Sequence, residues 1–255
     1  MTKQQIRKPL ITIVSMMAIL AIFFIDPIEQ DLAYHNFIDT NKIFGVPNFW
    51  NVMSNIPFFI VGIYGLYSLK RSAIIPQMRM AYGIWFFGVA MVAFGSGYYH
   101  LSPSNETLVW DRLPMTVAFM SLFAIIISEF INVKKGKLML LPLLVLGALS
   151  VFYWQWTESN GVGDLRFYAL IQFLPIILIP IIILSYPSQY DGVKGYWYLL
   201  IFYVLAKALE FFDAQIFNLL AGGMSGHALK HVAAAIGVYM LIVSFKKRTR
   251  LDVTK

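Results

Sequence analysis

Residues 95–115 read GSGYYHLSPSNETLVWDRLPM, and they place a cluster of polar and ionisable side chains between strongly apolar segments. A second polar motif, HALKH, occupies residues 227–231 near the start of the last apolar segment. Ionisable groups are expensive inside a bilayer, so such clusters mark candidate functional sites by default. These two motifs are therefore the candidate functional site of the chain.

Composition predicts a polytopic helical membrane protein. Of the 255 residues, 59% are hydrophobic and only 13% are charged, whereas soluble domains average about 25% charged residues. Apolar runs recur that are long enough to cross a hydrocarbon core of ~30 Å as helices. The net charge of +7 does not indicate a nucleic-acid partner, because the Lys and Arg residues lie in short clusters beside the apolar runs.

We expect an all-α, polytopic transmembrane bundle of eight helices. The predicted segments are 10–25, 49–69, 80–101, 109–131, 138–156, 167–186, 196–219 and 228–245. They divide the chain into an N-terminal transmembrane helix with an external loop (1–47), a seven-helix core (48–245) and a basic tail (246–255). Positive charge concentrates in alternate loops, so the positive-inside rule predicts cytoplasmic termini and places both polar motifs at the outer face.

The histidines predict a zinc site. His227 and His231 are four residues apart, on one face of a helix, and His100 comes from another helix. Three imidazoles with an open fourth position form the ligand set of a catalytic zinc ion. The chain has no cysteine, so a metal must be held by His, Asp or Glu. The alternative is that these histidines only form hydrogen bonds between helices, and the remaining His35 is interpreted as an ordinary loop residue.

Two further residues of the first motif each allow two roles. Asp111 acts as a general base on a metal-activated water, or it caps its helix and pairs with Arg112. Ser96 shares a helix face with His100, where it donates a hydrogen bond to a developing oxyanion or bonds back to its own helix.

Other polar residues are interpreted mainly as structural. Asn48, Asn51, Ser54 and Asn55 line the outer half of the first core helix, where amide and hydroxyl side chains commonly bond to neighbouring helices. Lys207, Glu210 and Asp213 follow one stripe of the predicted helix 196–219. This stripe forms an internal ion-pair network or a polar wall of a substrate cavity, and Asp213 lies nearest to the outer face.

Taken together, the motifs resemble the alkaline ceramidase family. The match rests on Ser96 and His100, on Asp111 within WDRLPM, on His227 and His231, and on the segment NFWNVMSN that starts at residue 48. The resemblance implies a seven-helix bundle in which three histidines bind Zn²⁺. It also implies a mechanism, in which zinc-activated water attacks a lipid amide, Asp111 accepts the proton, and Ser96 with zinc stabilises the oxyanion.

Two departures from the family concern ligands. The ceramidases carry acidic calcium ligands before and at the start of the first core helix, whereas this helix starts at Asn48, and Asp39 and Asn41 are isolated candidates, so calcium is not predicted. Lys230 stands where an aromatic residue is usual. It binds an acidic or phosphorylated headgroup there, or it extends outward to interfacial water.

The sequence therefore predicts a membrane zinc hydrolase of the ceramidase type that releases a fatty acid from a ceramide-like N-acyl lipid. The predicted substrate-binding residues are Lys230, Asp213 and Tyr99. Two alternatives remain, namely a lipid ester hydrolase with the same zinc site and a lipid receptor in which zinc has no catalytic role.

Overall fold

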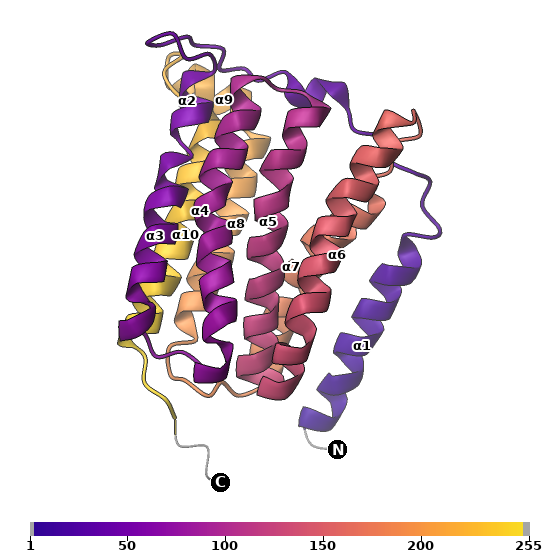
Figure 1. Cartoon of the computed structure of the whole chain (residues 1–255), viewed down its shortest axis with the longest axis vertical. Helices are drawn as coiled ribbons and strands as arrows, with labels where there is room; N and C mark the ends of the chain where they lie inside the picture. The colour runs from indigo at the N-terminus through magenta and orange to yellow at the C-terminus, as the bar shows by residue number, and fades with distance from the viewer. Residues whose placement is uncertain (1–2, 252–255) are drawn as a thin grey trace.

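A computed structural model describes residues 3–251 as a bundle of roughly parallel and antiparallel helices (Figure 1). The helices are α1 (Lys3–Ala21), α2 (Phe49–Met53), α3 (Ile56–Ser68), α4 (Arg79–Leu101), α5 (Asn105–Ile126), α6 (Val133–Ser159), α7 (Arg166–Ser185), α8 (Lys194–Phe211), α9 (Asp213–Leu219) and α10 (Gly226–Lys247). A π-helical turn, Ile127–Ile131, continues α5. The predicted all-α bundle is confirmed.

The order of the helices around the bundle places the two sequence motifs side by side. Helix α4 packs most extensively on α5, and α10 packs most extensively on α8 and also contacts α3. Helices α3 and α4 are in contact, so α4 and α10, which carry the histidines, both flank α3. Helix α1 lies at the edge of the bundle, where it contacts α7 (Figure 1).

Two segments that the sequence predicts as single helices are broken in the structure. The predicted helix 49–69 consists of α2 and α3, because the chain turns at Ser54 and Asn55 just before Pro57, which lacks a backbone N–H donor. The predicted helix 196–219 consists of α8 and α9, which meet at Phe212. Both breaks lie toward the upper end of the bundle in Figure 1, where α4 ends and α10 begins. His100 lies in the last turn of α4, and His227 lies in the first turn of α10.

Within residues 3–251, six helical segments are long and apolar enough to cross a membrane, whereas the sequence predicts eight spans. They are Phe49–Arg71, Pro76–Leu101, Asn105–Ile131, Val133–Ser159, Arg166–Ser185 and Gly226–Lys247. Helix α1 falls short because its apolar part, Pro9–Ala21, is too short. Helix α8 carries Lys194, Lys207 and Glu210 within its 18 residues, although it packs firmly in the bundle.

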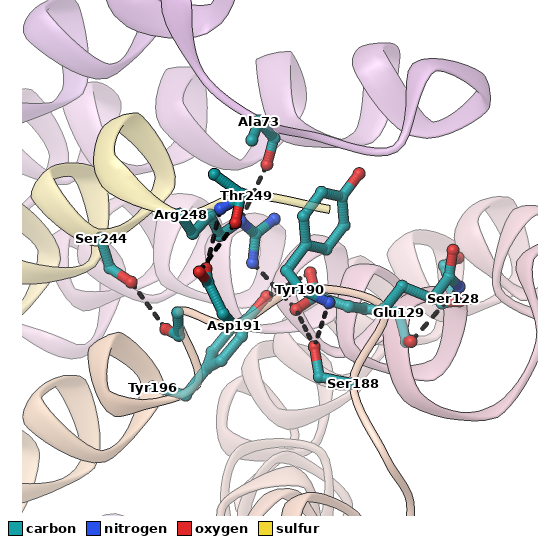
Figure 2. A network of polar contacts seen from close by, with 12 residues as sticks. Ala73, Ser128, Glu129, Ser188, Tyr190, Asp191, Tyr196, Ser244, Arg248 and Thr249 are labelled. Atoms are coloured by element: carbon teal, nitrogen blue, oxygen red, sulfur yellow. Dashed lines mark hydrogen bonds and ion pairs between the residues drawn. The ribbon is translucent and has the colours of Figure 1, made fainter. Parts of the chain in front are cut away.

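A buried ion pair between Arg248 and Glu129 links the helices at the end of the bundle where α10 ends (Figure 2). Arg248, just after α10, donates from Nη1 to Glu129 Oε1 at 2.8 Å and from Nε to the Ala73 carbonyl at 2.8 Å. Neither side chain of the Arg248–Glu129 pair is exposed. Glu129 lies in the π-helical turn and also accepts from Tyr196 Oη at 2.9 Å. This network fastens the end of α10 to the turns around it.

Candidate metal centre

His100 of α4 and His227 and His231 of α10 converge in the interior. All three are buried, and one potential ligand atom from each lies within 4.8 Å of the others. The Nε2 atoms of His227 and His100 are 3.4 Å apart, and the three ring centroids are separated by 4.9 to 5.2 Å. In the described part of the chain this is the one group of three or more His, Asp and Glu residues with metal-ligand spacing.

The geometry fits a tetrahedral zinc ion. With Zn–N bonds of about 2.0–2.1 Å, two ligand nitrogens on one tetrahedral ion stand about 3.3–3.4 Å apart. The Nε2 atoms of His100 and His227 are separated by that distance. The three histidines can therefore hold one metal ion and leave a fourth position for water or substrate.

Ser54 fixes the orientation of His231. The Ser54 hydroxyl donates to the Asn51 carbonyl at 3.3 Å and lies 2.9 Å from His231 Nδ1. A His231 ring that binds a metal through Nε2 carries its proton on Nδ1, and Ser54 Oγ then accepts from this Nδ1–H. Partners of this kind orient metal ligands, so Ser54 does more than join two helices.

Short contacts between helices bring the motifs together. A Cβ built on Gly95 would lie 1.9 Å from the carbonyl oxygen of Trp110, so α4 and α5 approach more closely there than a side chain would permit. A Cβ on Gly226 would lie 2.1 Å from the Leu209 carbonyl, which joins the start of α10 to α8. The Asp213 carboxylate accepts from the backbone N–H of His227 at 2.6 Å and holds the first turn of α10.

An apolar cavity of about 430 Å³ adjoins His231. Ser96, Asp111 and Lys230 also line it, and most of the remaining wall is aliphatic and aromatic. The Asp111 carboxylate interacts with the Ser96 hydroxyl and lies near Lys230. The cavity thus combines a metal-type centre, a carboxylate and a hydroxyl with space for an acyl chain.

Asp111 does not have the capping role that the sequence left open. Helix α5 begins at Asn105, four residues before the predicted start, because Ser104 and Thr107 form a capping box. Asp111 therefore lies in the second turn of α5. Among residues 3–251 it forms no ion pair with Arg112.

Two of the three predicted substrate-binding residues do not line the cavity. Tyr99 is 1% exposed and its hydroxyl lies 2.9 Å from Nδ1 of His35, so it packs beneath the loop between α1 and α2. Asp213 holds the backbone of His227, as described above. Lys230 does line the cavity, and its ammonium pairs with Glu210. Tyr99 and Asp213 miss the cavity because their side chains point elsewhere. Spacing along the sequence does not predict how a helix is rotated against its neighbours.

The loop between α1 and α2 contributes residues that the sequence analysis did not identify. The Phe37 ring lies 4.7 Å from the rings of both His100 and His227 and covers the centre. Gln30 and Tyr34 line the cavity. His35, interpreted from sequence as an ordinary loop residue, bonds to Asn105 as well as to Tyr99. The aromatic and amide residues of this loop were visible in the sequence. They follow no helical spacing, so the sequence could not predict which of them reach the site.

Asp39 and Asn41 also lie in this loop. Asp39 is fully buried, and burial raises the pKa of its carboxyl above the usual value. Asp39 Oδ1 accepts from the Asn41 backbone N–H at 3.1 Å, and the Asn41 side chain donates to the Gly222 carbonyl at 3.0 Å. These contacts join the loop to the segment between α9 and α10.

The structure is thus a bundle of apolar helices in which three buried histidines lie beside a largely apolar cavity. The family model named Ceramidase matches residues 35–252, so the chain belongs to the ceramidase family, and the predicted resemblance is confirmed. Membership makes the chain a ceramidase-like hydrolase. A comparison with curated proteins found no match. Helix α1 and residues 22–34 precede the matched region.

Proposed function

We propose that this chain is an integral membrane, zinc-dependent lipid amide hydrolase that releases a fatty acid from a ceramide-like N-acyl lipid. The observation that carries the proposal is that His231, Asp111 and Ser96 line one largely apolar cavity. A fatty-acyl chain against the aliphatic part of its wall brings the amide carbonyl to these three residues. Bound Zn²⁺ supplies Lewis acidity for the carbonyl and for a water molecule.

The residues of the chain have distinct roles in this proposal. The Asp111 carboxylate accepts the proton of the attacking water and returns it to the leaving amine. Once Asp111 has accepted the water proton, the Ser96 hydroxyl no longer donates to its carboxylate and instead donates to the oxygen of the former carbonyl as negative charge develops there. The apolar wall excludes water from the acyl chain, and Phe37 covers the histidines from the outer side.

Membrane integration is supported by the exterior of the bundle. Large apolar side chains are exposed along most helices, among them Met80 and Phe94 on α4, Leu138 and Leu141 on α6, and Val204 on α8. Such a surface suits lipid better than water. Helix α1 starts, and helix α10 ends, at the same end of the bundle, opposite the histidines (Figure 1). With the positive-inside rule, this arrangement supports cytoplasmic termini and a centre that faces the outer side.

The test is metal analysis followed by hydrolysis. We expect detergent-purified protein to bind about one zinc per chain, and His100→Ala and His231→Ala to lose it. Zinc-loaded protein is then incubated with an amide and an ester of the same acyl chain, and the released fatty acid is measured by mass spectrometry. Asp111→Asn should retain zinc and lose at least about a hundredfold in rate. Folded wild-type protein that binds no zinc, or that cleaves only the ester, would refute the proposal.

A further inference from the structure

Arg112 is a buried cation without a carboxylate partner. Its residue is 7% exposed, and it takes part in none of the ion pairs formed within residues 3–251. Arg112 Nη2 donates to Gln30 Oε1 at 2.6 Å, whereas Nη1 is buried and has no hydrogen-bond partner. A buried charge that lacks a counter-ion is costly, so a protein retains one where a ligand supplies the opposite charge.

The surroundings of Arg112 hold the guanidinium in place. Its Cζ lies 4.0 Å from the centre of the Trp154 ring and 4.6 Å from that of Tyr168. Trp154 Nε1 donates to Glu158 Oε1 at 3.0 Å, and the same oxygen accepts from the Gln30 backbone N–H at 2.6 Å. Because aromatic rings contact the guanidinium and Gln30 occupies Nη2, the free N–H of Nη1 remains for a ligand.

The charges around the cavity do not balance. Arg112, Lys207 and Lys230 line it together with Glu210 and Asp111. Glu210 Oε2 lies 2.7 Å from Lys207 Nζ, and Glu210 Oε1 pairs with Lys230, so this one carboxylate serves two lysines. Asp111 is the proposed proton acceptor. Three cations therefore share two carboxylates, and Arg112 is the one that forms no ion pair within residues 3–251.

We propose that Arg112, positioned by Gln30, binds an oxyanion, a carboxylate or a phosphate, carried by the headgroup of the lipid amide. The inference rests on the proposed function and defines its substrate class as acidic N-acyl lipids. The acyl chain occupies the apolar wall, the amide lies at Asp111, and the acidic group accepts from Arg112 Nη1. Gln30 precedes the matched family region, so the N-terminal segment contributes to selectivity.

A binding experiment tests this without turnover. Decyl phosphate and decanol are titrated calorimetrically into detergent-purified full-length protein. We expect the wild type to bind the phosphate at least about tenfold more tightly, the effect of charge-assisted hydrogen bonds. Arg112→Met should reduce this ratio to about twofold or less, whereas Lys135→Met, which removes an exposed charge on α6, should retain it. Equal affinity of wild-type protein for both amphiphiles overturns the inference.

A second variant guards against misfolding. Zinc content and thermal stability are measured for each variant, and Arg112→Lys, which keeps the charge but loses the planar fork, should show a reduced but clear preference for the phosphate. An unchanged phosphate preference in folded Arg112→Met also overturns the inference. If phosphate preference is present but no amide is cleaved, the hydrolase proposal fails and the anion subsite stands.

The acidic group has one other source, the carboxylate of the released fatty acid. Hydrolysis assays distinguish the headgroup from the released fatty acid as the source. They compare two amides that share one acyl chain, of which only one carries a phosphate on the headgroup. A larger rise in KM for the phosphorylated amide in Arg112→Met supports the headgroup. Equal losses for both amides, together with weaker inhibition by decanoate, would assign Arg112 to the product and overturn the inference.

Discussion

The hydrogen bond between Ser54 and His231 gives the sharpest prediction about the metal centre. Ser54→Ala removes the acceptor that lies 2.9 Å from Nδ1 of His231, at a site where both residues are buried. The Nδ1–H is then left without a partner, and the ring loses the contact that holds Nε2 toward the other histidines. We expect weaker metal binding in a protein that is otherwise folded.

The expected magnitude follows from the burial of the bond. Leaving a buried donor unsatisfied costs about 1–3 kcal/mol. Loss of a partner that orients a metal ligand lowers metal affinity about 10- to 100-fold, which corresponds to about 1.4–2.8 kcal/mol. The two estimates agree, so zinc affinity in Ser54→Ala should fall about 10- to 100-fold.

Zinc competition with a chromophoric chelator measures this change. The matched control is Ser150→Ala on α6, a buried serine whose hydroxyl donates only to a carbonyl of its own helix, Gly147, at 2.7 Å. We expect Ser150→Ala to bind zinc as the wild type does. If Ser54→Ala also stays within about twofold of the wild type, Ser54 does not orient His231 and the argument from tautomer and geometry is wrong.

Three further predictions concern the scaffold. Gly95→Ala should destabilise the protein by about 1–3 kcal/mol and lower zinc occupancy, as measured by thermal unfolding and metal analysis. The control is Gly97→Ala, which should change neither quantity because a Cβ there meets no atom within 4 Å. Arg248→Met should lower the free energy of unfolding by about 3–5 kcal/mol, against little change for exposed Lys247→Met, in denaturant titrations. The Arg166 guanidinium, which also donates to the Ile22 carbonyl, holds the pKa of Asp164 below its usual value. This contribution is therefore present above about pH 4 and lost as the pH falls through the lowered pKa. The protection of residues 22–28 against hydrogen exchange, expressed relative to the intrinsic rate at each pH, should fall in acid. It should fall much less in Asp164→Asn, in which the contact is already weakened.

The sequence by itself predicts most helices and the group of three histidines. The position and length of most helices follow from apolar runs, because a chain that cannot hydrogen-bond to lipid must satisfy its backbone within helices. The three histidines were predictable as a group because three of only four histidines in the chain lie in the two polar motifs, and the helical spacing of His227 and His231 places these two on one face. The same spacing relates Ser96 to His100.

The tertiary structure decided which side chains meet. Helix spacing fixes a face but not its rotation against neighbours, so Tyr99 packs under the loop and Asp213 binds backbone, while Ser54 contacts His231. The sequence placed Arg112 only as a neighbour of Asp111. Its lack of an ion pair within residues 3–251, its aromatic surroundings and its contact with Gln30, 82 residues away, arise only when distant segments pack, since long-range contacts carry no local periodicity.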